Sequence, residues 1–150
     1  MSLNRIVLIC RHHADPHEEL PADAALSPGN ALKVNSTNEC LKVATEGDWW
    51  NGMVAKEDVL RGKTVADAFA AADIVPIHMA APGDVLQMRF LAGGNYARGA
   101  LLILDSAGRV KLLSAVTSGV TVKKVIGEVW EALNLSASGA VDTLGKVLIH

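Results

Sequence analysis

The alternation of apolar and polar residues predicts short β-strands separated by turns along most of the chain. Apolar Leu32 and Val34 alternate with polar neighbours, and Leu41 and Val43 do the same a few positions later. Between these two runs lies the segment 35–38, of sequence NSTN, whose side chains can bond their own backbone and so favour a turn. This pattern predicts a β-hairpin.

A second segment resembles this hairpin. Residues 98–115 carry a glycine, a leucine and an Asp-Ser turn at almost the spacing of a glycine, a leucine and an Asn-Ser turn in residues 28–44, so that Gly99 aligns with Gly29. The returning strands agree only after a slip of one residue, and such a slip exchanges the faces of a strand. We therefore expect a bulge or a different turn length in one of the two hairpins.

Further apolar segments follow each hairpin. Residues 53–58 and a final strand within 82–90 follow the first, and residues 125–131 and 144–149 follow the second. The chain is therefore predicted to contain two similar halves, the first of them lengthened by an insertion around 60–79.

The predicted fold class is mainly β. Strands and turns that recur every 8–12 residues, roughly, are typical of an all-β sandwich or barrel. One short helix is expected within the insertion, at residues 64–72, because this segment has helical propensity and begins with Thr64, which can cap a helix.

Residues 1–24 have a different character. One possible strand, Ile6 to Ile9, precedes a polar stretch, and Pro16 and Pro21 interrupt any helix there. We interpret residues 1–24 as an extended N-terminal arm with no core of its own. Residues 25–150 are then a single β domain.

Composition and charge exclude several classes of protein. The chain has 150 residues, of which half are apolar and a fifth charged. It is long enough to bury a core, and its apolar content argues against disorder over most of its length. With 14 Lys and Arg against 16 Asp and Glu, no basic excess is present to bind nucleic acid. No apolar run approaches the roughly 20 residues of a membrane span, and the N-terminus lacks a convincing signal peptide. Two cysteines make no disulfide framework.

The most suggestive chemistry is a run of histidine and carboxylate residues, which are suitable ligand types for zinc. Their spacing matches no established metal site, and an extended arm would lose entropy on chelation. We therefore expect this run to be solvated or bound to a partner, with no metal. Its members are His12, His13, Asp15, His17, Glu18 and Glu19.

Other candidate groups also have structural explanations. A nucleophilic Cys10 or Cys40 would need a base beside it, and Cys40 has the parity of a core position in its strand. Trp49 and Trp50 are adjacent, so in a strand one of them faces outward. They either cover the end of the barrel or anchor an interface, where tryptophan is enriched. We expect no catalytic residue and no cofactor.

Several short motifs are spread over roughly residues 26–149: LSPG at 26–29, VAKED at 54–58, GKTV at 62–65, PGD at 82–84 before MRF at 88–90, RGALL at 98–102, DSAGRV at 105–110 and IGEV at 126–129. Together they resemble the motifs of the capsid decoration (cement) proteins of tailed bacteriophages. The resemblance implies a β-tulip-like barrel or sandwich that binds the outer surface of the head, as trimers or dimers, with an N-terminal arm reaching to neighbours and no catalysis.

The expected function is that of a virion structural protein on the outer surface of the phage head, present in the host cytoplasm before assembly. Its expected partners are the major capsid protein and further copies of itself, with a trimer favoured over a dimer, and neither nucleic acid nor a membrane. The alternatives are a small β-barrel ligand-binding protein or enzyme, which needs a pocket with converging polar groups, and a tail or fibre module. The candidate interface residues are Ile6, Leu8, Arg11, His12, His13, His17, Trp49 and Trp50.

Overall fold

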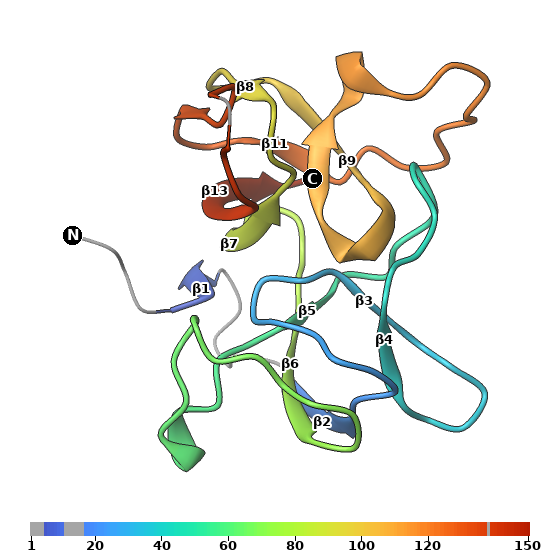
Figure 1. The fold of residues 1–150 in the computed structure, drawn as a ribbon, viewed down its shortest axis with the longest axis vertical. Coiled ribbons are helices and arrows are strands. Elements are labelled where there is room, and N and C mark those ends of the chain that lie inside the picture. Colours follow the sequence, from blue (N-terminus) through green and yellow to red (C-terminus); the bar gives the residue numbers. More distant parts are fainter. Residues whose placement is uncertain (1–4, 11–16, 138) are drawn as a thin grey trace.

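The computed structural model describes residues 5–10, 17–137 and 139–150 and is mainly β (Figure 1). Its strands are β1 (Val7–Ile9), β2 (His17–Pro21), β3 (Leu32–Val34), β4 (Cys40–Lys42), β5 (Met53–Ala55), β6 (Ile74–Met79), β7 (Val85–Phe90), β8 (Asn95–Tyr96), β9 (Leu101–Leu104), β10 (Val110–Leu112), β11 (Gly127–Val129), β12 (Leu133–Asn134) and β13 (Thr143–Ile149). Three short 3-10 turns accompany them: η1 (Val59–Arg61), η2 (Ser106–Gly108) and η3 (Leu113–Ala115). No helix in the described ranges is long and apolar enough to cross a membrane.

The second half of the chain closes into a five-stranded barrel. β7 pairs with β13, β13 with β11, β11 with β9 and β9 with β10, all antiparallel. The ring is completed by a parallel contact between β10 and β7, at Val110 and Phe90. The predicted barrel is therefore present.

The first half repeats the same ring with shorter pairings. β2 pairs with β6, and β6 with β5, both antiparallel. An isolated antiparallel bridge joins Ala31 to Val54, and β3 forms a hairpin with β4. A parallel bridge between Ala22 and Cys40 completes the circle. The two halves thus share strand order and strand directions, and Figure 1 shows them as a blue-to-green and a yellow-to-red lobe.

The two hairpins match residue for residue. Leu32 faces Lys42 in the first, and Leu102 faces Leu112 in the second, so both turns have the same length. Gly29 and Gly99 before them both have positive φ, at 86° and 79°, which a residue with a side chain adopts rarely. The prediction of two similar halves is therefore confirmed, whereas the expected slip between the hairpins is wrong.

The predicted boundary between the halves is also wrong. β6, which sequence analysis placed in an insertion, pairs with β5 as β13 pairs with β11, so β6 is the counterpart of β13. β7 pairs with β13 as β2 pairs with β6, and it therefore begins the second half. The misassignment arose because β6 and β7 are both buried on two faces and show no alternation that would distinguish them.

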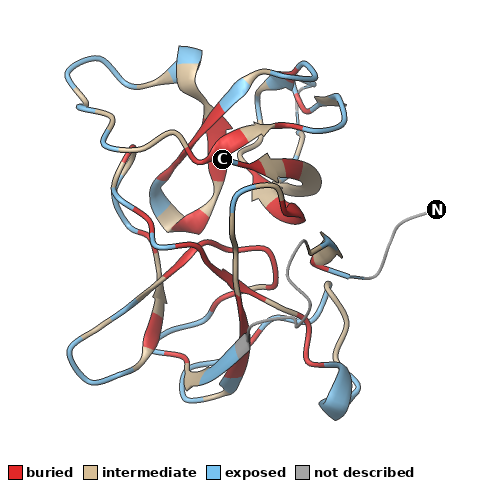
Figure 2. Ribbon diagram, turned by 180° about the vertical axis from the view of Figure 1, so that it is seen from behind, coloured by how far each residue is buried: buried red, intermediate tan, exposed pale blue. Residues whose placement is uncertain are grey.

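Equivalent positions fill the two barrels. Leu32, Cys40, Ala55 and Ile77 belong to the core of the first, and their counterparts Leu102, Val110, Val129 and Val147 belong to the core of the second. The second core also takes in Ala31, Val43, Trp50 and Val54 from the first half, so the two barrels share packed apolar surface. Figure 2 shows buried residues in the strands of both lobes.

The prediction of a coreless N-terminal arm is wrong for the described residues. β2 is a barrel strand, and Ala22 after it is buried. β1 pairs with β7 at Leu86 and Val85, where the edge of β7 is left uncovered by β10, which meets β7 only at Phe90. Ile6 is fully buried in the larger core. Covering an open strand edge with a short strand protects its backbone groups from other chains.

The helix expected at residues 64–72 is absent. The side chain of Asp67 instead accepts hydrogen bonds from the Thr64 backbone N–H and hydroxyl, at 2.7 and 2.9 Å, and so fixes a turn. Phe69 forms an isolated bridge with Leu26 and is buried in the first core. Tertiary packing therefore overrides the local helical propensity of this segment.

Candidate functional site

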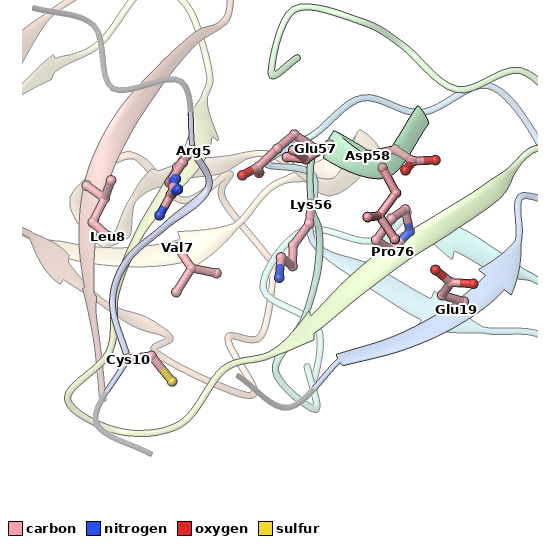
Figure 3. Close-up of a pocket in the computed structure, with 11 residues that line it drawn as sticks. Arg5, Val7, Leu8, Cys10, Glu19, Lys56, Glu57, Asp58 and Pro76 are labelled. Atoms are coloured by element: carbon pink, nitrogen blue, oxygen red, sulfur yellow. The ribbon is translucent and has the colours of Figure 1, made fainter. Parts of the chain in front are cut away.

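The N-terminal segment and the η1 loop enclose a pocket of about 580 Å³ against the outer face of the first barrel. Figure 3 shows β1 on one side, β2 and β6 on the other, and the Lys56 to Asp58 segment between them. The lining residues are Arg5, Val7, Leu8, Cys10, Glu19, Lys56, Glu57, Asp58, Val59, Leu60 and Pro76.

The pocket lining carries charges of both signs, and two of its carboxylates have structural roles. Glu57 accepts a hydrogen bond from the Ile6 backbone N–H at 3.0 Å and so holds the N-terminal segment in place. Asp58 caps η1 by accepting from the Arg61 N–H at 3.2 Å, and it also pairs with the Arg61 guanidinium at 2.5 Å. This hydrogen bond raises the pKa of Arg61.

A thiol, an imidazole and a carboxylate converge beside this pocket. The Nε2 atom of His78 lies 3.2 Å from the Oδ2 atom of Asp84, and both side chains are fully buried. Cys10, which is half-buried, places its Sγ atom in the same cluster, where the three ligand atoms all lie within 4.8 Å of one another. The Ala81 backbone N–H donates to Asp84 Oδ2 at 3.0 Å and helps to orient the carboxylate.

Three separate segments build this cluster, which we call the Cys10 cluster. Cys10 directly follows β1, His78 lies in β6, and Asp84 lies in the turn before β7. Along β6, Val75, Ile77 and Met79 pack with the first core, so the alternation of a strand directs His78 to the opposite face. The arrangement has the ligand types of a transition-metal site and also those of a nucleophilic thiol with a base.

Of these three residues, only Cys10 was a candidate from the sequence; His78 and Asp84 were not predicted. The available signal was a single histidine inside the apolar run IVPIHM of residues 74–79. The other cysteine behaves as predicted, since Cys40 is fully buried in the first core. Burial raises the pKa of the Cys40 thiol to about 11, which keeps it in the unreactive thiol form.

The two adjacent tryptophans have opposite environments. Trp50 is buried in the larger core, and its indole N–H donates to the Met53 carbonyl at 2.9 Å. Trp49 is 59% exposed, and the Lys124 ammonium lies 5.0 Å from its ring centroid. The Asp48 carboxylate accepts from the Trp49 backbone N–H at 2.8 Å and holds this loop.

Asp48 is itself held by two cations. Its carboxylate pairs with Lys33 and, at 2.9 Å, with Lys123. Hydrogen bonds from Lys33, Lys123 and the Trp49 N–H lower the pKa of Asp48 far below its usual range. Trp49 therefore projects from a loop that side-chain contacts tie to two other parts of the chain.

The predicted interface residues whose side chains the structure describes differ in burial. Ile6 and Trp50 are buried in the core, which corrects the prediction for these two, because a side chain needed for packing presents no free surface. Leu8 is half-buried and Trp49 is exposed. Arg11, His12 and His13 lie outside the described residues, as does Asp15 of the histidine- and carboxylate-rich run. The backbone of His17 pairs with His78 in β2, which also contains the exposed Glu18 and Glu19.

Comparison with models of known protein families gives no match, and comparison with curated proteins gives none either.

Proposed function

We propose that the protein is a non-enzymatic structural protein of a phage virion, which binds the outer surface of the head and links neighbouring major capsid proteins. The proposal rests on the motifs that resemble those of capsid decoration proteins and on one structural observation, the exposed and anchored Trp49. The near-neutral charge balance of the chain suits a protein that binds protein rather than DNA.

Trp49 is the observation that carries the proposal. Its indole is 59% exposed, and tryptophan is enriched among the residues that dominate binding energy. Asp48 and Lys124 restrain the loop and the ring before any partner arrives. A side chain ordered in advance loses less entropy on binding.

A second apolar projection lies on the first barrel. Val59 and Leu60 in η1 are 68% and 95% exposed. The turn that presents them is fixed by Asp58 at its start and by Gly62, with φ of 72°, at its end. Two rigid apolar projections on one molecule suit a protein that contacts more than one capsid subunit.

The proposed mechanism is mechanical. Copies placed across the seams between capsid subunits add contacts there and so oppose the outward pressure of packaged DNA. Each copy that engages two subunits raises the effective concentration of the second contact, so weak individual contacts give firm attachment. The expected homo-oligomer, with a trimer favoured over a dimer, would extend this effect, and light scattering of the purified protein measures its size.

Co-sedimentation with expanded phage capsids that lack the protein tests the proposal. We expect saturable binding at a stoichiometry set by the lattice. The Trp49→Ala variant should bind roughly 30-fold more weakly, which corresponds to the loss of about 2 kcal/mol at a binding hot spot. Trp130→Ala is the matched control, because Trp130 is also exposed, at 37%, and has a cation, Arg98, over its ring.

Two results would contradict the proposal. Wild-type protein that fails to sediment with the capsids would favour the alternative of a ligand-binding barrel, for which the charged pocket is the site to examine. Equal binding by wild-type protein and the Trp49 variant would show that Trp49 does not contribute to the interface.

A further inference from the structure

We propose that Cys10, His78 and Asp84 form a binding site for a divalent transition metal of the zinc class. This inference is independent of the proposed capsid function. It concerns a site that ties the N-terminal segment to the junction of the two barrels.

The spacing of the three groups fits a metal. In zinc sites the metal lies about 2.0–2.1 Å from nitrogen or carboxylate oxygen and about 2.3 Å from sulfur, which puts tetrahedral ligands roughly 3.3–3.6 Å apart. His78 Nε2 and Asp84 Oδ2 are 3.2 Å apart. The sulfur atom of the half-buried Cys10 lies within 4.8 Å of both, so the three atoms are close enough together to occupy three corners of a tetrahedron around one ion.

The charges of the three groups also fit. A Cys10 thiolate and the Asp84 carboxylate carry two negative charges, and a neutral His78 adds none, so together they balance a dication. His78 and Asp84 are 0% exposed. Buried charges in proteins are paired or coordinate metals, and a dication held by these three groups would be balanced by the two negative charges.

The internal repeat provides a comparison for His78. The counterpart of His78 in the second half is Leu148, because β5 pairs with β6 at Val54 and His78 as β11 pairs with β13 at Glu128 and Leu148. The barrel topology therefore accepts an apolar residue at this position. A buried histidine here serves something other than closure of the barrel, and it lies beside Cys10, which directly follows β1.

The ligand types select the metal. Thiolate with imidazole favours Zn²⁺ and its analogue Co²⁺ over Mg²⁺ and Ca²⁺, which prefer oxygen ligands only. Cys10 also lines the charged pocket, so an ion can reach the cluster from that side, and a water molecule would take the fourth position of such a three-ligand site. Binding at this place links β1, β6 and the turn before β7, and so stabilises the folded state at the expense of the unfolded chain.

Titration of chelator-treated full-length protein with Co²⁺ tests the site directly. We expect one ion per chain, with the near-ultraviolet absorption band of a thiolate bound to cobalt, and displacement of that ion by Zn²⁺. Cys10→Ser should abolish the band. Cys40→Ala is the matched control and should retain it, because Cys40 is buried in the first core.

A second measurement needs no variant, because it compares the native protein with and without Zn²⁺. Zn²⁺ should slow the alkylation of Cys10 by iodoacetamide at least tenfold in the native protein, measured by mass spectrometry of the Cys10 peptide.

The double variant His12→Ala/His13→Ala tests whether the neighbouring histidines in the sequence bind the ion instead, and it should keep the cobalt band. Absence of the band in the wild type, its loss in the double variant, its retention in Cys10→Ser, or an unchanged alkylation rate would each overturn the proposal.

Discussion

Replacing Ile6 by alanine tests whether the N-terminal segment is packed against the barrel or is a free arm. Ile6 is 0% exposed and belongs to the larger core. Its backbone is held on both sides, since its N–H donates to Glu57 at 3.0 Å and its carbonyl accepts from the Gln87 N–H at 2.7 Å. The backbone contacts do not involve the side chain, so the substitution removes the packing of that side chain and leaves these bonds in place.

The size of the effect follows from burial. Truncation of a fully buried isoleucine to alanine costs about 2–5 kcal/mol, from lost transfer energy and the cavity that remains. We take about 3 kcal/mol for Ile6, because it lies near the edge strand β1, where some collapse is possible. With an urea m-value of about 2 kcal/mol/M, the unfolding midpoint should fall by roughly 1.5 M.

Equilibrium urea unfolding, followed by tryptophan fluorescence and far-ultraviolet circular dichroism, measures this shift. Ile9→Ala is the matched control, since it changes the same residue type three positions along the chain at a site that is 47% exposed. We expect the control to shift the midpoint by less than about 0.5 M. Equal, small shifts for the two variants would refute the packed segment and restore the interpretation of residues 1–24 as an arm.

Two further predictions concern the packing at Gly127, in the second half of the chain, and the hydrogen bonds of Glu46, in the first half. Gly127→Ala should lower the free energy of unfolding by about 3 kcal/mol, because the new Cβ would lie 2.1 Å from the Leu148 carbonyl oxygen and would push the paired strand away; a loss below about 1 kcal/mol in urea unfolding would contradict this. Hydrogen bonds from Thr117 and Lys111 lower the pKa of Glu46 from 4.5 to about 2. The unfolded chain therefore takes up this proton first, so the contribution of Glu46 is full above pH 4.5 and is lost as the pH falls towards 2. In the Glu46→Gln variant the urea midpoint should depend less steeply on pH in this window. A slope equal to that of the wild type would argue against this role of Glu46.

The N-terminal segment shows where local sequence information ends. The apolar run from Ile6 to Ile9 was sufficient to predict a strand, and β1 occupies Val7–Ile9. Whether such a strand is free or packed depends on an open edge elsewhere in the fold. Here that edge belongs to β7, far along the chain, and only the closed barrel shows that β10 leaves part of it uncovered.

The candidate sites also combine features that the sequence could predict with features that only the tertiary structure shows. The sequence predicted one outward-facing tryptophan if Trp49 and Trp50 lay in a strand. The pair lies in a loop instead, and the structure shows that Trp50 is buried and Trp49 exposed. The Cys10 cluster was not predictable, because its three residues follow no motif and come from three segments that only strand pairing brings together.

The sequence by itself determined the β class, both hairpins and the likeness of the two halves, because alternation and turn chemistry act over a few residues. The tertiary structure decided the boundary of the repeat, the packing of the N-terminal segment and the convergence of Cys10, His78 and Asp84. These features depend on which strands pair. Pairing between distant strands depends on burial and edge closure across the whole barrel, which no short pattern of residues records.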